Sequence, residues 1–211
     1  MRLRFVPGFV LALLACGPAA AHPHVFVDSK SEFVVDKNDN LTAIKHHWRF
    51  DPAFSAYALQ GLDTNGDGNY SREELHPLAQ ENVESLSEFD YFTFTDTGDE
   101  PIQFEDPVDY WLDFDGTQLV LNFTLPLTKK LPLKGKTEAF QIYDPTIFVA
   151  FFLDEKQPAT VSDASCHIKH IKEGDNKLTA STNFSTDFLA TINNLDSFAA
   201  TFAEELRVSC P

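Results

Sequence analysis

The stretch HVFVDSKSEFVVDKNDNLTAIKHHWRF, residues 24–50, decides the fold class of this chain of 211 residues. Residues 24–36 are rich in Val and Phe, which favours a β-strand, and residues 37–40 are typical of a turn. Residues 41–50 then alternate between two faces. One face carries Ile44, His46, Trp48 and Phe50, and the other carries Lys45, His47 and Arg49. The stretch therefore predicts a β-hairpin.

More strands are predicted after this hairpin. They cover residues 90–95, 110–114, 119–125, 140–143, 147–153 and 164–172. Residues 147–153 are apolar throughout, so we expect that strand to be buried on both faces. Short strands separated by turns predict a β-sandwich-like body, closed by short C-terminal helices near residues 186–193 and 197–206. The expected class is α+β, mostly β.

A helical segment interrupts the strands at residues 51–88. Asp51 is a good helix N-cap and Pro52 a good first helical residue. A second helix is predicted to start where Ser71 and Glu74 have capping-box spacing. Pro77 falls inside that second helix, which predicts a kink or a restart. We expect a helix-loop-helix insertion after the second strand.

The loop of this insertion, DTNGDGNYSREE at residues 63–74, fits the calcium loop of an EF-hand. Gly68 stands at the sixth position, where the sharp turn needs a positive φ. Ca²⁺ is a hard ion that prefers oxygen ligands. The expected ligands are Asp63, Asn65, Asp67, Asn69, Ser71 and Glu74. A polar surface turn also favours Asp, Asn and Gly, but it does not usually place Glu at the twelfth position.

The first residues are typical of an export signal. Arg2 and Arg4 precede an apolar run at residues 9–15, and small residues at 19–21 suit cleavage. We expect a signal peptide at residues 1–21 and a single mature domain at residues 22–211 in the periplasm. This apolar run is too short to span a membrane comfortably, and no segment of the mature chain is long and apolar enough to do so. An alternative is a lipoprotein anchored at Cys16.

The cysteines predict a disulfide, and the net charge excludes one class of partner. Cleavage would remove Cys16 and leave Cys166 and Cys210, which predicts one disulfide in an oxidising compartment. The formal net charge of −16 argues against nucleic acid, because phosphate contacts need Lys and Arg.

The mature chain would begin His22-Pro23-His24. In an extended segment both rings point to the same face, and with the α-amine they suit Zn²⁺, Ni²⁺, Co²⁺ or Cu²⁺. A frayed polar terminus is the alternative. Further donors are His46, His47, His167 or His170, although His46 on an apolar face is more often a core histidine.

Four segments together resemble the domain-of-unknown-function family 1007. They are His22–Asp28, Trp48–Asp51, the calcium loop and Tyr143-Asp144-Pro145. The resemblance implies an exported component of a divalent-metal transport system with a membrane transporter as partner. It implies no reaction, and the chain shows no catalytic motif; Asp144 most simply forms a turn. A calcium-dependent interaction module and a copper histidine-brace oxidase are the alternatives.

Overall fold

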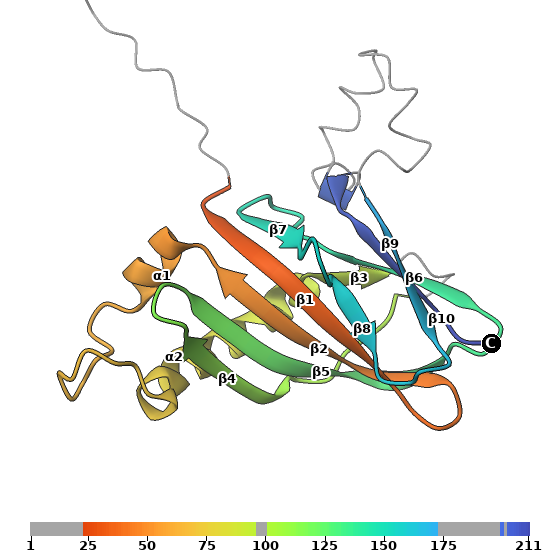
Figure 1. The fold of residues 1–211 in the computed structure, drawn as a ribbon, viewed down its shortest axis with the longest axis horizontal. Coiled ribbons are helices and arrows are strands. Elements are labelled where there is room, and N and C mark those ends of the chain that lie inside the picture. Colours follow the sequence, from red (N-terminus) through yellow and green to blue (C-terminus); the bar gives the residue numbers. More distant parts are fainter. Residues whose placement is uncertain (1–22, 96–100, 173–198, 201) are drawn as a thin grey trace, which may run out of the picture.

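The computed structural model describes residues 23–95, 101–172, 199–200 and 202–211, and two β-sheets make up most of this part (Figure 1). One sheet has the strand order β4-β5-β2-β1-β7, with β8 also paired to β1, and the other has the order β3-β6-β10-β9. The elements are β1 (Val25–Val35), β2 (Asn40–Phe50), α1 (Pro52–Ala58), α2 (Arg72–Leu86), the 3-10 helix η1 (Ser87–Phe92), β3 (Thr93–Thr95), β4 (Val108–Phe114), β5 (Leu119–Pro132), β6 (Thr137–Ile142), β7 (Val149–Leu153), β8 (Ala159–Val161), β9 (His167–Ile171) and β10 (Glu205–Ser209).

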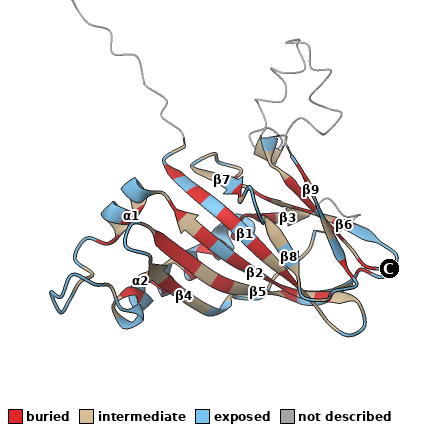
Figure 2. Cartoon of the chain, viewed as in Figure 1, coloured by how far each residue is buried: buried red, intermediate tan, exposed pale blue. Residues whose placement is uncertain are grey.

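The predicted hairpin is present as β1 and β2. The two strands pair antiparallel, with Ser29 opposite Trp48 and Lys30 opposite His47. Figure 2 shows buried and exposed residues alternating along both strands, as expected for a sheet with one covered face. The predicted faces of residues 41–50 are confirmed, because Trp48 is buried while His47 is exposed.

The inner face of the six-stranded sheet is covered by the second sheet and by α2. Phe33 of β1 contacts Phe140 of β6, with ring centroids 4.9 Å apart. Leu75 and Val83 of α2 belong to the same buried cluster as Trp48. The class predicted from the sequence, α+β and mostly β, is confirmed, and α2 takes a share of the covering role that a second sheet has in a complete sandwich.

The apolar run at residues 147–153 differs from its prediction. Its strand, β7, lies at the edge of the larger sheet and pairs parallel to β1. Phe152 is 53% exposed, so the expectation of burial on both faces is wrong. An apolar run indicates burial only on average, and this one combines a buried Leu153 with aromatic rings that reach the surface.

The end of the chain differs as well. Residues 199, 200 and 202 are helical, but Glu205–Ser209 forms β10 between β6 and β9, so the predicted helix at 197–206 is wrong over its last residues. Leu206 and Val208 are buried on either side of the exposed Arg207, a period that suits a strand. The helix predicted at 186–193 lies outside the described residues. Within the described part of the chain, none of the helices has the length and apolarity to cross a bilayer.

Candidate functional site

Helices α1 and α2 flank the candidate loop, and their ends are fixed by side-chain caps. Asp51 caps α1 by accepting hydrogen bonds from the backbone N–H groups of Ala53 and Phe54, both at 2.9 Å. The other oxygen of Asp51 accepts from the N–H of Phe26 at 3.0 Å. The cap therefore ties the start of α1 to β1, as well as satisfying the free donors of the helix.

Helix α2 begins with the capping box predicted from the sequence. The hydroxyl of Ser71 accepts from the N–H of Glu74, and the carboxylate of Glu74 accepts from the N–H of Ser71 at 3.0 Å. The helix then continues through Pro77 to Leu86 as one element. Of the kink or restart predicted at Pro77, the restart is therefore wrong, and the kink stays a prediction. Burial of Leu75, Ala79 and Val83 on one side of the helix compensates for the missing proline N–H.

Side-chain oxygens at the first, third and fifth loop positions turn toward the loop's own backbone. Asp63 Oδ1 accepts from the N–H groups of Gly66 and Asp67, at 2.8 and 3.1 Å. Asp63 Oδ2 accepts from the N–H of Gly68 at 3.0 Å, and Gly68 has a φ of 78°. Asn65 Oδ1 accepts from Asp67 at 2.8 Å. These bonds curl the loop around its acidic side chains.

Glu74 links the two ends of the loop. Its Oε1 accepts from the N–H and hydroxyl of Thr64, at 3.0 and 2.9 Å, and its Oε2 accepts from Ser71. The hydrogen bonds from Ser71 and then Thr64 lower the pKa of Glu74 to about 2. The carboxylate is therefore ionised at neutral pH and available to a cation.

The oxygen-bearing side chains of the loop stand at the ligand positions of an EF-hand calcium loop. They belong to Asp63, Asn65, Asp67, Asn69, Ser71 and Glu74. The carboxylates of the loop are nevertheless spread out. Among described residues, the one group of three His, Cys, Asp or Glu side chains whose ligating atoms all lie within 4.8 Å of one another is elsewhere, at Asp39, Cys166 and Cys210. In this structure one oxygen of Glu74 is held by Thr64.

His46 is a core residue. Its Nδ1 lies 3.4 Å from the hydroxyl of Ser31 and its Nε2 lies 3.3 Å from the hydroxyl of Thr93. Its ring packs against Phe123, with centroids 4.9 Å apart. Burial lowers the pKa of His46 from 6.5 to about 3. Both nitrogens are therefore occupied and the ring is neutral, which leaves no free lone pair for a metal.

The other candidate histidines do not form one cluster in the described part of the chain. His22 is outside the described residues, and His24 precedes β1 with its ring 5.0 Å from that of Phe148. His47 faces outward and contacts Asn122 at 2.7 Å. His167 and His170 both lie on β9 of the second sheet, where His170 Nε2 lies 2.9 Å from Glu204. The described part of the chain therefore leaves the expected site at His22 and His24 as a prediction.

Residues 8–210 match the family described as "Protein of unknown function (DUF1007)". The chain belongs to this family. An uncharacterized protein of Haemophilus influenzae is 28% identical over 208 residues, which cover 95% of this chain and 97% of that protein. The resemblance found in the sequence is thereby confirmed at the level of the family.

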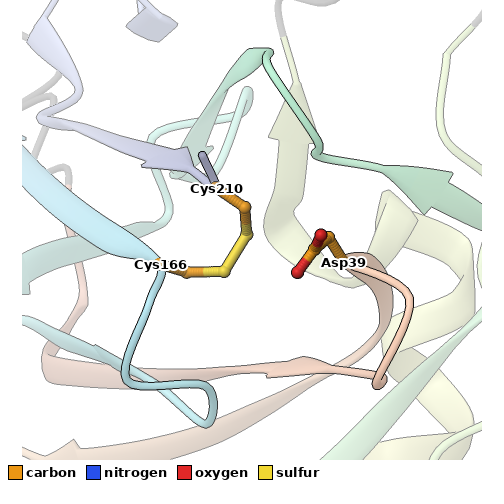
Figure 3. Close-up of side chains that lie close together, drawn as sticks. All are labelled: Asp39, Cys166 and Cys210. Atoms are coloured by element: carbon orange, nitrogen blue, oxygen red, sulfur yellow. A yellow bond between two sulfur atoms is a disulfide. The ribbon is translucent and has the colours of Figure 1, made fainter.

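The two cysteines of the DUF1007 protein that lie in the described residues form the predicted disulfide. Cys166, just before β9, is bonded to Cys210, just after β10, across a sequence separation of 44. Figure 3 shows the carboxylate of Asp39 beside the bond. Because both sulfurs are used in the disulfide, the oxidised protein offers no thiolate ligand there.

Asp144 has a structural role in this DUF1007 protein. One oxygen accepts from the N–H and hydroxyl of Thr146, at 2.7 and 2.8 Å, and the other accepts from the N–H of Val149 at 2.9 Å. The buried carboxylate therefore shapes the turn before β7, in line with the simpler of the two sequence interpretations.

A row of side chains on the outer face of the larger sheet was not predicted from the sequence. Strand register places Lys30 opposite His47, His47 opposite Asn122, and Asn122 opposite Trp111. The row crosses β1, β2, β5 and β4. Alternation in β2 gave the face of His47, but no local signal predicts which strands lie next to one another.

Proposed function

We propose that this DUF1007 protein is an exported calcium-binding accessory protein of a divalent-metal transport system. Calcium would bind in the loop at residues 63–74 and would have a structural role. The observation that carries the calcium part is the match between loop sequence and loop shape: oxygen-bearing side chains stand at each ligand position, and Asp63 already accepts three backbone N–H groups of the loop.

The structural role follows from what the loop connects. It joins α1, which Asp51 ties to β1, with α2, which contributes Leu75 and Val83 to the main core. An ion that fixes both ends of the loop would therefore fix both helices on the sheet. Extracellular calcium modules bind with Kd on the order of 10⁻⁴–10⁻³ M. Calcium bound only by the folded state adds stability that grows with the logarithm of its concentration once that concentration is well above Kd.

The transition-metal part rests on the residues before β1. A mature chain starting at His22 would offer an α-amine and the rings of His22 and His24, which suit Zn²⁺, Ni²⁺, Co²⁺ or Cu²⁺. A membrane metal transporter would be the partner. The disulfide between Cys166 and Cys210 supports export, because such bonds persist in oxidising compartments such as the periplasm.

The calcium proposal is tested by thermal unfolding of three proteins: the wild type, Glu74→Gln and Glu73→Gln. Gln at the third helical position still serves a capping box, so Glu74→Gln removes the calcium ligand while keeping the helix cap. Glu73 is an adjacent exposed acid that is not a ligand position, which makes Glu73→Gln the matched control. We expect millimolar calcium to raise the Tm of the wild type and the control, but not that of Glu74→Gln. If calcium does not change the Tm of the wild type, the proposed structural role of calcium is wrong.

The metal-transport part needs a second measurement. Native mass spectrometry of the exported protein, prepared without an affinity tag and compared before and after mild chelation, identifies bound ions and the first residue. Calcium plus a transition metal on a chain starting at His22, with the second ion absent in His22→Ala, supports metal handling. Calcium alone favours a calcium-dependent interaction module, and a lipid-modified mass starting at Cys16 contradicts the free His22 terminus.

A further inference from the structure

The outer face of the larger sheet contains a groove of about 260 Å³. The cross-strand row of Lys30, His47, Asn122 and Trp111 runs through it, and Gln157 and Thr160 border it. The inner face of the same sheet is covered by α2 and the second sheet, so this groove lies on the opposite side from the core. It is distinct from the candidate calcium loop, whose ligand positions do not line it.

Charges in and beside the groove are paired with one another. Lys45 Nζ lies 3.2 Å from the carboxylate of Glu32, and Lys30 Nζ lies 3.2 Å from that of Asp154. A ligand with a net charge would have to compete with one of these pairs. A neutral ligand can instead accept from the ammonium groups and donate to the carboxylates while the pairs stay intact.

The other lining groups include the aromatic ring of Trp111, planar polar side chains and the hydroxyl groups of Thr124 and Thr160. The Nε1 of Trp111 donates to Asp113 at 2.7 Å, and Arg72 lies over the ring at 4.9 Å from its centroid, so the orientation of the ring is fixed. His47 and Asn122 hold each other at 2.7 Å. Asn122 Nδ2 also donates to the backbone oxygen of Val120 at 3.4 Å, so a ligand could use its second amide hydrogen, the second lone pair of its Oδ1 and the Nε2 of His47.

We propose that this groove is a binding site for a neutral saccharide. A sugar combines weakly apolar C–H faces, which pack on an indole ring, with hydroxyl groups that both donate and accept hydrogen bonds. The groove presents the matching set: the ring of Trp111, the amide of Asn122, the imidazole of His47 and paired charges. Its volume is below the ~300–1,000 Å³ of sites for drug-sized ligands, which suits one sugar ring with its neighbours extending into solvent.

The test uses tryptophan fluorescence together with saturation-transfer NMR on the full mature protein. The chain has two tryptophans, and Trp48 is buried in the core, so a ligand in the groove is reported by Trp111. The probes are glucose, N-acetylglucosamine, maltose and diacetylchitobiose, with glucuronic acid as the charged comparison. Titrations are made in excess calcium and repeated with a chelator, so that failure of the calcium proposal does not affect the result.

We expect at least one neutral probe to change the emission and to receive saturation transfer, with binding weakened at least tenfold in Asn122→Ala and in His47→Gln. Tyr57→Ala removes an exposed aromatic ring of α1 outside the groove and should bind as the wild type does. Circular dichroism checks that each variant is folded. If Asn122→Ala does not fold, the test of the groove relies on His47→Gln. The proposal is overturned if no neutral probe binds, if glucuronic acid binds more tightly, or if binding survives unchanged in both groove variants.

Discussion

Arg72 and Trp111 connect the candidate calcium loop to the outer face of the larger sheet. The guanidinium of Arg72 lies 4.9 Å from the centroid of the Trp111 ring and makes two hydrogen bonds, at 2.8 and 3.0 Å, to Asp113 on the same strand. Arg72 is the first residue of α2 and directly follows Ser71, the ninth position of the loop. A change in loop shape therefore acts directly on the surroundings of one tryptophan.

This contact predicts that calcium changes the fluorescence of Trp111. If Glu74 leaves Thr64 to bind the ion, the first turn of α2 shifts and Arg72 moves relative to the ring. A calcium titration followed by emission should show a saturable change in the wild type. The change should be lost in Trp111→Phe, and reduced in Arg72→Ala although calorimetry still detects calcium. A full emission change in Trp111→Phe would show that Trp48 is the reporter and would contradict the coupling.

His46 predicts a loss of stability on mild acidification. Its pKa is lowered from 6.5 to about 3 in the folded protein, so the unfolded state takes up the proton first. The stability that neutral His46 provides is complete above pH ~6.5 and falls as the pH decreases toward ~3. Between about pH 7.5 and about pH 5 we expect a loss of about 2 kcal/mol in the free energy of unfolding, measured by urea denaturation.

The matched variant for this prediction is His46→Gln, which keeps a polar side chain between Ser31 and Thr93 but does not titrate. Its absolute stability can differ from that of the wild type, so the comparison is between the two slopes against pH. The slope should flatten in the variant over this range. Equal slopes would mean that His46 is accessible to protons in the folded state.

The disulfide predicts a sizeable stabilisation. The bond between Cys166 and Cys210 closes a segment with a sequence separation of 44, and a chain-entropy estimate for that loop is about 4 kcal/mol. The double variant Cys166→Ala/Cys210→Ala should therefore be about 2–4 kcal/mol less stable in chemical denaturation. Adding a reductant should then lower the stability of the wild type but not of the double variant. A double variant as stable as the oxidised wild type would contradict this.

Because Leu75 is buried in the main core, we expect α2 and the sheets to unfold together. The side chain is fully buried in the cluster that contains Trp48, so Leu75→Ala should cost about 2–5 kcal/mol. The partly buried Leu78 on the same helix is the comparison, and Leu78→Ala should cost less. Far-ultraviolet circular dichroism and Trp48 emission should give one coincident transition. Two separated transitions would mean that the helical insertion is an independent unit.

Much of the architecture is predictable because it depends on local patterns. The period of residues 41–50 gave the inner face of β2, and Asp51 with Pro52 gave the start of α1. The disulfide was predicted from the two cysteines that remain if the expected signal peptide is removed. Each of these features is specified within a few residues or by simple counting.

The misplaced elements depend on partners distant in sequence. The apolar β7 pairs with β1 alone and so ends the larger sheet, and residues 205–209 form a strand because β6 and β9 lie on either side of them. The outer-face groove was missed for the same reason. Trp111 is separated from His47 by the whole helical insertion and β3 in sequence, and only the pairing of both strands with β5 brings them into one row.

The position of β10 inside the second sheet constrains how the chain acquires its structure. Its neighbour β6 ends at Ile142, and β10 begins only at Glu205. The edge of β6 that pairs with β10 therefore stays unpaired until the residues between them have been synthesised and β10 has followed. A polypeptide threaded across a membrane from its amino end would expose that unpaired edge on arrival. Assembly of this protein is thus expected to be slow, governed by distant contacts, and dependent on protection from strand-to-strand association in the meantime.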